Sequence, residues 1–286
     1  CDYFCTFCTI PLARGKSRSH TIEQTLVSAN EAAQTEAREI VLTGVNLGDF
    51  GVQRGETFFE LIQELDKIEA VDRFRISSIE PNLLEDRIIE FVAESKRFAP
   101  HFHIPLQSGS DELLTKMRRK YKRKLYSQRI AKIRELIPEA AIGVDVIVGF
   151  PGETEAHFME TYEYLRELDV NYLHVFPYSE RANTTARKME GAVPVKLRHE
   201  RSKMLRILSE KKKRVFYSSQ IGKVRQVLFE REEHDDMIYG FTENYVRVQV
   251  PYDPLLVNEL VTVKLEDFGG KEVLNAQEIS ASVVHL

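Results

Sequence analysis

All three cysteines of this 286-residue chain lie within its first eight residues, in the run CDYFCTFC. An odd number of clustered cysteines does not suit a disulfide framework. Three thiolates on one short loop can instead hold three irons of a [4Fe–4S] cluster and leave the fourth iron open. We therefore interpret Cys1, Cys5 and Cys8 as metal ligands in a protein of the reducing cytoplasm. A structural zinc site, which normally takes four ligands, is the weaker alternative.

The chain begins with Cys rather than Met, so we expect a fragment of a longer protein. No apolar run approaches the roughly 18 residues of a membrane span, and no membrane association is expected. The net charge of −4 excludes a uniformly basic nucleic-acid-binding surface. The positive charge is local, because seven of the nine residues at 116–124 are Lys or Arg.

The first two thirds of the chain alternate between short β-branched runs and segments of helical period. Such alternation predicts a parallel sheet covered by helices. The five predicted strands are Glu39–Gly44, Arg73–Ser78, His101–Leu106, Ile142–Gly149 and Val170–Pro177. Each ends in a polar or glycine-containing loop. Chemistry in (β/α) barrels sits at those strand ends, so we expect an active site there.

The pattern changes after a long basic helix that is predicted from Pro194 to about Tyr217. The later runs are β-like without intervening helices, and they predict a small antiparallel barrel of the OB type. We therefore expect one domain at 1–216 and a second at 217–286. The second domain carries six basic and twelve acidic residues.

Four long motifs occur in an order that resembles the radical S-adenosylmethionine (SAM) methylthiotransferases. They are CDYFCTFCTIPLARGKSRS at 1–19, HIPLQSGSDELLTKMRR at 103–119, GVDVIVGFPGET at 143–154 and HVFPYSERANT at 174–184. The resemblance implies an α/β fold, namely a partial (β/α) radical SAM barrel followed by a C-terminal TRAM barrel that binds RNA. It also implies that the open iron of the cluster binds SAM, which is then cleaved to a 5′-deoxyadenosyl radical by one electron from a reductant.

The same resemblance places SAM at the strand ends. It implies that Phe7 lies near the adenine and that Gly44 and Asn46 meet the amino group of the methionine part. Ser77 and Glu80 would approach the ribose or the methionine part. The pocket would be completed by Gln107, Asp145 and Phe176.

The segment LTGVNLGDFG at 42–51 is similar to the subgroup that acts on N6-threonylcarbamoyladenosine beside the tRNA anticodon. The expected reaction inserts a methylthio group at carbon 2 of that adenine. Isopentenyladenosine in tRNA and an aspartate of a ribosomal protein are the alternative substrates. The family also has an N-terminal domain with three cysteines that hold a second [4Fe–4S] cluster, and these cysteines are absent from the 286 residues.

The expected RNA contacts lie near the cysteine loop, at Arg14, Arg18 and Arg118, and involve phosphates of the anticodon stem-loop. Tyr121 and Tyr126 interleave with the basic run and are expected to stack on bases. In the C-terminal barrel, a local basic face is expected from Arg225, Arg231, Tyr245, Arg247 and Lys264. The rival from another class is an RNA-binding module whose iron–sulfur cluster is purely structural. The oligomeric state is left open.

Overall fold

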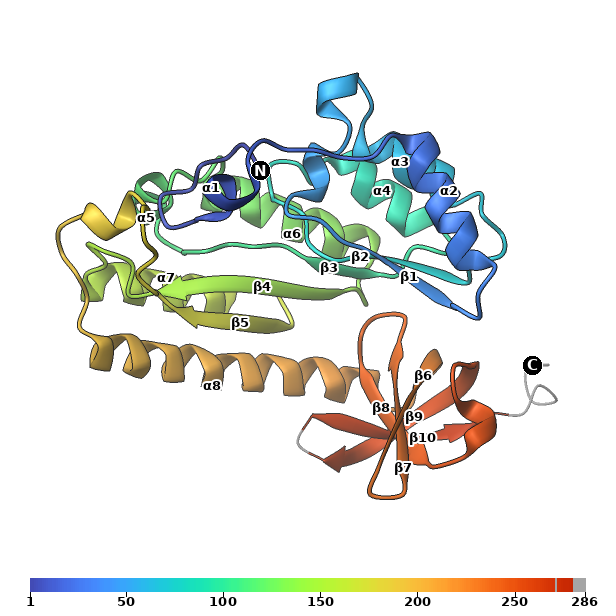
Figure 1. Cartoon of the computed structure of the whole chain (residues 1–286). Coiled ribbons are helices and arrows are strands. Elements are labelled where there is room, and N and C mark those ends of the chain that lie inside the picture. The colour runs from blue at the N-terminus through green and yellow to red at the C-terminus, as the bar shows by residue number, and fades with distance from the viewer. Residues whose placement is uncertain (271, 280–286) are drawn as a thin grey trace.

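The computed structural model describes residues 1–270 and 272–279, which form an α/β part and a C-terminal barrel (Figure 1). The strands of the α/β part are β1 (Glu39–Leu42), β2 (Arg73–Ile76), β3 (His101–His103), β4 (Ala141–Val148) and β5 (Tyr172–Pro177). Its helices are α1 (Ile10–Arg14), α2 (Ile22–Ala33), α3 (Phe58–Leu65), α4 (Asp86–Glu94), α5 (Asp111–Lys116), α6 (Arg123–Leu136), α7 (Glu155–Glu167) and α8 (Val195–Gln220).

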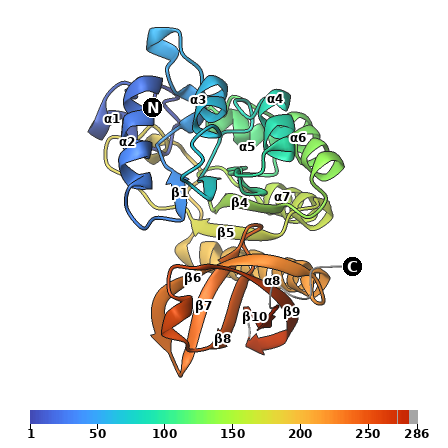
Figure 2. The ribbon, with the colours of Figure 1, turned by 90° about the vertical axis from the view of Figure 1, so that its right-hand side faces the viewer.

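The five strands are parallel, as predicted, and run in the order β1-β2 and β3-β4-β5. The two groups join through a bridge between Phe74 and Phe98 and through the Ile79 N–H, which donates to the His103 carbonyl over 3.1 Å. The helices cover the outside of this curved sheet, and α8 runs beneath β4 and β5 (Figures 1 and 2). This arrangement confirms the expected partial (β/α) barrel.

Three of the covering helices begin with reciprocal side-chain caps. The hydroxyls of Thr21, Thr57 and Thr154 each accept from the backbone N–H three residues later, and that third side chain bonds back to the threonine N–H. Such caps satisfy N–H groups that have no partner inside the helix. The helix faces that follow pack into one apolar core with the strands.

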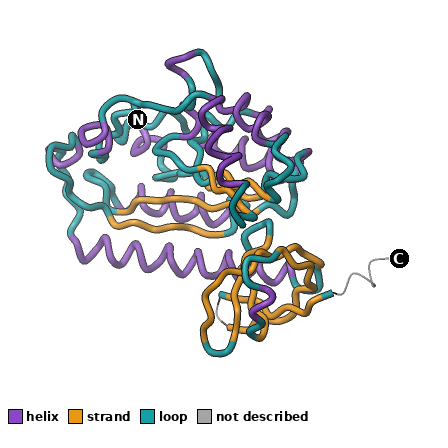
Figure 3. The backbone as a smooth tube through the Cα atoms, turned by 45° about the vertical axis from the view of Figure 1, so that its right-hand side comes forward, coloured by secondary structure: helices purple, strands orange, loops and turns teal. Residues whose placement is uncertain are grey.

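The C-terminal barrel is closed, in the strand order β10-β8-β7-β6-β9 (Figure 3). The strands are β6 (Val224–His234), β7 (Met237–Thr242), β8 (Arg247–Pro251), β9 (Leu260–Gly270) and β10 (Val273–Glu278). Four neighbouring pairs are antiparallel as predicted, but β8 and β10 are parallel. A closed ring with an odd number of strands cannot alternate direction throughout, so one parallel pair is unavoidable.

Helix α8 connects the two parts without a flexible linker. Phe216 and Tyr217, in its last turns, belong to the apolar core of the barrel. The division expected between residues 216 and 217 therefore falls inside a continuous helix.

The turn between β7 and β8 inserts into the N-terminal end of the parallel sheet. The ring of Tyr245 lies 4.5 Å from the ring of His101 and 4.9 Å from the guanidinium carbon of Arg75. Arg225 also points into this junction and bonds Glu139 and Glu243. Tyr245 and Arg225 thus help to dock the barrel, and their expected place on an RNA-binding face stays a prediction.

Candidate active site

The strands of the α/β part separate apolar from polar side chains. On β5, Leu173 and Val175 are buried in the helix-covered core, while His174 and Phe176 alternate with them and are exposed. Successive strand residues point to opposite faces, so the polar set occupies the face without helices. That face carries two apolar side chains, Val41 and Phe176, and otherwise Glu39, Arg73, Arg75, His101, His103, Asp145, Tyr172 and His174.

The cysteine loop, residues 1–9, is anchored above the carboxyl ends of these strands by Thr6, which is 2% exposed. The Thr6 N–H donates to the Met117 carbonyl over 3.2 Å, and its hydroxyl donates to the Lys116 carbonyl over 3.0 Å. The Ala186 N–H donates to the Thr6 carbonyl over 2.8 Å. Segments after β3 and β5 therefore hold the loop.

The sulfur atoms of two cysteines accept hydrogen bonds. The Ile10 N–H lies 3.4 Å from Cys8 Sγ, and Arg119 Nη1 lies 3.2 Å from Cys5 Sγ. Donors of this kind are what a cluster thiolate requires around it. Within the described ranges, no three cysteine, histidine or carboxylate side chains already converge as a metal site. The donor chemistry fits a cluster, although the sulfurs are not gathered.

Arg119 belongs to the basic run at 116–124, and sequence reasoning did not single it out as a site residue. Its side chain is 4% exposed, forms an ion pair with Glu80, and its Nε donates to the Tyr121 hydroxyl over 3.0 Å. Tyr121 and Tyr126 are buried as well, and their hydroxyls donate to backbone carbonyls of the segment after β3. Their expected role in stacking on bases is therefore wrong.

Burial sets the ionisation of this group. Loss of solvent raises the pKa of the Cys5 thiol, and the nearby Arg119 guanidinium opposes that rise. Burial likewise raises the pKa of Glu80, again opposed by Arg119. The Arg119 guanidinium thus favours the ionised forms of Cys5 and Glu80 against the effect of burial.

A cavity of about 430 Å³ brings several of the predicted residues together. Its lining includes Cys1, Arg14, Arg18, Gly44 and Asn46. The Asn46 side-chain nitrogen donates to Asp49 over 2.5 Å, whereas its buried carbonyl oxygen has no partner among the described residues. Asn46 therefore has a buried acceptor without a partner, and it lines the same cavity as the first cysteine.

The other predicted residues lie around this centre in different surroundings. Gln107 adopts a φ of 68°, and its N–H donates to the Asp145 carbonyl over 2.8 Å. Ser77 follows β2, where its N–H donates to the Leu42 carbonyl over 3.1 Å. Phe7 is half-buried, and its ring packs edge-on against Phe150 with centroids 6.5 Å apart.

Arg118 is exposed beyond the end of α5, and it does not line the cavity that Arg14 and Arg18 share. Lys120 joins Arg18 in a neighbouring hollow of about 220 Å³. The three predicted RNA-binding arginines therefore do not form one cluster.

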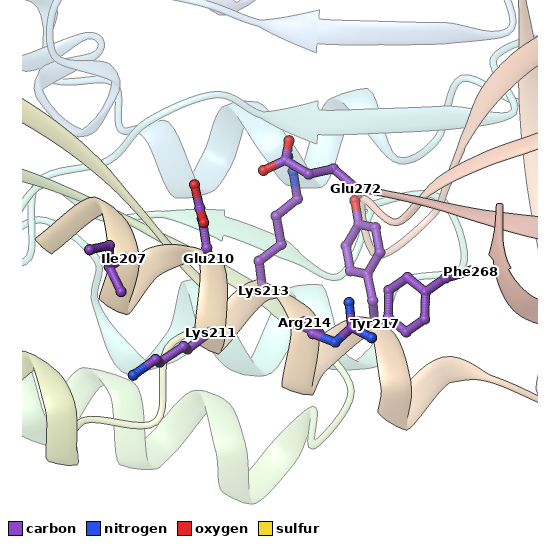
Figure 4. Close-up of a pocket in the computed structure, with 8 residues that line it drawn as sticks. All are labelled: Ile207, Glu210, Lys211, Lys213, Arg214, Tyr217, Phe268 and Glu272. Carbon is purple, nitrogen blue, oxygen red and sulfur yellow. Dashed lines mark hydrogen bonds and ion pairs between the residues drawn. The ribbon is translucent and has the colours of Figure 1, made fainter. Parts of the chain in front are cut away.

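A second groove of about 250 Å³ lies between α8 and the C-terminal barrel (Figure 4). Two of its cations are already engaged. Lys213 bonds Glu272 over 3.0 Å, and Arg214 lies 4.6 Å from the centre of the Phe268 ring. This groove contains none of the predicted site residues. In the part of the chain that the structure describes, no helix is long and apolar enough to cross a membrane.

Comparisons with known proteins agree with this geometry. The family model of the radical SAM superfamily matches residues 1–165. A threonylcarbamoyladenosine tRNA methylthiotransferase of Bacillus subtilis is 40% identical over 271 residues, which cover 93% of this chain and 60% of that protein. A tRNA-2-methylthio-N(6)-dimethylallyladenosine synthase of Desulfitobacterium hafniense is 35% identical, with 93% and 61% covered. The chain thus spans about 60% of the length of these relatives.

A solved structure shows the same fold. The radical S-adenosylmethionine methyltransferase TsrM from Kitasatospora setae superposes with a TM-score of 0.56 at 15% identity, covering 65% of this chain and 37% of that one. Residues 1–165, which the family model matches, include the cysteine loop and the first four strands. Sequence and structure together establish that this chain belongs to the radical SAM superfamily.

Proposed function

We propose that this chain forms the cluster-, SAM- and RNA-binding part of a tRNA methylthiotransferase that acts on N6-threonylcarbamoyladenosine. The observation that carries the proposal is the anchored cysteine loop above the polar strand ends, where Cys5, Arg119 and Glu80 form one connected group. The 40% identity to the Bacillus subtilis enzyme supports this choice of substrate.

Cys1, Cys5 and Cys8 would hold one [4Fe–4S] cluster after a closure of the loop that gathers their sulfurs. With SAM bound, such a cluster supplies the radical that removes hydrogen from carbon 2 of the adenine. The chain itself contributes N–H donors to two of the sulfurs, from Ile10 and Arg119. These donors spread the negative charge of the thiolates and stabilise a reducible cluster.

The strand-end residues supply complementary charges for SAM. The free carbonyl oxygen of Asn46 can accept from the methionine ammonium, and Gly44 lies beside it in the cavity. The Arg119 guanidinium, which pairs with Glu80, would add a buried positive charge near the methionine carboxylate. Ser77, Glu80, Gln107 and Asp145 would provide the remaining polar contacts, and Phe7 and Phe176 the apolar ones.

The RNA would approach with its anticodon stem-loop. Arg14, Arg18 and Arg118 would bind phosphates around the loop, and the C-terminal barrel would act as a TRAM module. An external reductant would supply the electron. The inserted sulfur must come from outside these residues, because the chain has three cysteines and all three would bind the cluster. In the longer relatives, a second cluster is the expected source.

A second candidate substrate is isopentenyladenosine in tRNA, favoured by the 35% identity to the dimethylallyladenosine synthase.

The experiment that tests the proposal uses anticodon stem-loop RNAs that carry deuterium at carbon 2 of the target adenine. The reconstituted chain is mixed anaerobically with SAM, dithionite and each RNA. Deuterium in the 5′-deoxyadenosine formed from the threonylcarbamoyl RNA supports the proposal. Unlabelled product with every RNA contradicts it.

A further inference from the structure

Two histidines on the helix-free face have no part in the site described so far. His103 is the last residue of β3, and His174 lies in β5. Their strand neighbours Phe102 and Leu173 are buried in the helix-covered core. The two imidazoles therefore point into the open concave side of the sheet.

The two histidines form one layer with Asp145. His103 Nε2 lies 2.9 Å from Asp145 Oδ1, and the ring centroids of His103 and His174 are 5.3 Å apart. Asp145 is the register partner of His174 across β4 and β5. The side chains of His103 and Asp145 are 20% and 23% exposed, so the layer is accessible from the open side.

A second layer of side chains bounds this space toward the N-terminal ends of the strands. One step toward the N-terminal ends of the strands, His101 donates or accepts a 2.7 Å hydrogen bond with the Tyr172 hydroxyl, and both rings lie against Tyr245 of the C-terminal barrel. Tyr172 and His174 are two positions apart on β5, which corresponds to a rise of roughly 7 Å. A group that enters the concave side is therefore stopped just below the two histidines.

The cysteine loop bounds the same space at the carboxyl ends of the strands. The Asp145 carbonyl accepts from the Leu106 N–H over 3.1 Å, and the Leu106 carbonyl accepts from the Tyr121 hydroxyl over 2.9 Å. Arg119 joins that hydroxyl to the Cys5 sulfur. The histidine layer thus lies between the radical source and the docked barrel. If the target adenine presents carbon 2 to the cluster, its N6 substituent would point toward this histidine layer.

We propose that His174, held beside the His103–Asp145 pair, is a specificity-determining residue that recognises the N6 substituent of the target adenine. It would hydrogen-bond a polar substituent that carries a carboxylate and a hydroxyl, such as threonylcarbamoyl. It would disfavour an apolar substituent such as isopentenyl, because the imidazole would then lose water without gaining a partner. This inference rests on the proposed function and deepens it.

The surroundings support this role. Burial, followed by the neighbouring His103, lowers the pKa of His174, while Asp145 opposes that shift. A neutral imidazole has one N–H donor and one acceptor nitrogen, which suits a carbamoyl-linked amino acid. An apolar substituent would call for a layer of aliphatic side chains instead of two imidazoles and a carboxylate.

The test compares His174→Phe, which keeps an aromatic ring, with His174→Asn, which keeps hydrogen-bonding capacity. His199→Phe on the exposed side of α8 is the matched control. Each reconstituted protein is titrated, by fluorescence anisotropy with SAM present, with stem-loops carrying threonylcarbamoyladenosine, isopentenyladenosine or adenosine. Thermal unfolding of each protein checks its folding.

We expect His174→Phe to weaken binding of the threonylcarbamoyl RNA about 10-fold and to leave the adenosine RNA unchanged. His174→Asn should recover part of the loss, and His199→Phe should match the parent chain. Equal losses for all three RNAs, or no loss for any, would overturn the inference. If the role of His174 is overturned but the parent chain still transfers deuterium from the threonylcarbamoyl RNA to 5′-deoxyadenosine, the proposed function stands. Absence of transfer from every RNA overturns both.

Discussion

The glutamate of the GFPGET motif forms a buried ion pair with an arginine of α8. Glu153 and Arg201 are 2% and 3% exposed at their side chains, and Arg201 Nη1 lies 2.6 Å from Glu153 Oε1. The same carboxylate oxygen accepts from the Gly149 N–H over 2.8 Å. The pair fastens the turn after β4 to helix α8. We predict that Arg201→Met strongly destabilises the chain because it leaves this carboxylate buried without a cation.

The size of the effect is limited because Glu153 can take up a proton in the variant. A glutamate of pKa about 4.3 in the unfolded chain costs about 3.7 kcal/mol to protonate at pH 7, at 1.36 kcal/mol per unit. This value caps the electrostatic loss, and it lies within the roughly 3–5 kcal/mol range for a broken buried pair. At pH 5 the same protonation costs about 1 kcal/mol. The deficit should therefore shrink as the pH falls.

Proton linkage gives the same direction for the pH dependence of the stability deficit. Burial raises the pKa of Glu153 in the folded protein even with Arg201 present, and removal of the arginine must raise it further. The folded variant then binds more protons than its unfolded chain, so its stability falls as the pH rises from 5 to 7. Urea unfolding at both pH values, followed by circular dichroism, measures the change. Lys203→Met, at an exposed position on α8, is the control.

A deficit below about 1 kcal/mol at pH 7, or one that does not depend on pH, would refute this reasoning. The double variant Glu153→Gln, Arg201→Met provides a further check. It should be more stable than Arg201→Met alone, because the buried charge is gone.

Three further predictions concern the cavity, the buried cation and the docked barrel. Asn46→Ala should weaken SAM binding about 10-fold in calorimetry, at unchanged iron content, because a hydrogen bond to a charged group is lost; unchanged affinity would remove Asn46 from the site. Arg119→Met should lower the free energy of unfolding by about 3 kcal/mol, measured with urea, because Glu80 loses its buried partner. Tyr245→Ala should cost about 2 kcal/mol in the same assay through lost contact with His101, whereas the similarly exposed Tyr252→Ala should cost little. Equal effects of the two tyrosine changes would contradict the docking role.

The parallel strands were predictable because their β-branched runs are local features of the sequence. The IGVDVIVG run, for example, contains most of β4, which spans Ala141–Val148. The closed barrel followed in the same way from five β-like runs without helices. Its parallel pair, β8 with β10, did not, because pairing between distant strands depends on ring closure and leaves no local pattern.

The burial of Arg119 and Tyr121 was beyond sequence reasoning for a related reason. Both residues lie in a run of cations that is typical of a solvated surface, and their partners Glu80 and Pro105 are far away or on another segment. One signal was available. Tyr121 precedes the N-cap of α6 and Tyr126 is the fourth residue of that helix, which is the spacing of a hydrophobic staple, and their rings lie 6.4 Å apart.

The docking of Tyr245 depends on how two domains meet, and no single-domain pattern encodes it. Among the candidate site residues, Arg14 and Arg18 line one cavity with Cys1, whereas Arg118 does not. The unpartnered oxygen of Asn46 and the histidine layer became visible through the geometry of the folded chain.

The central claim is that the three cysteines hold a cluster that cleaves SAM. The most direct measurement reconstitutes the chain anaerobically with iron and sulfide, reduces it with dithionite, adds SAM and quantifies 5′-deoxyadenosine against a Cys5→Ala control. The account predicts product from the parent chain and none from the variant. A parent chain that carries a full cluster and binds SAM, yet forms no more 5′-deoxyadenosine than the variant, would contradict it.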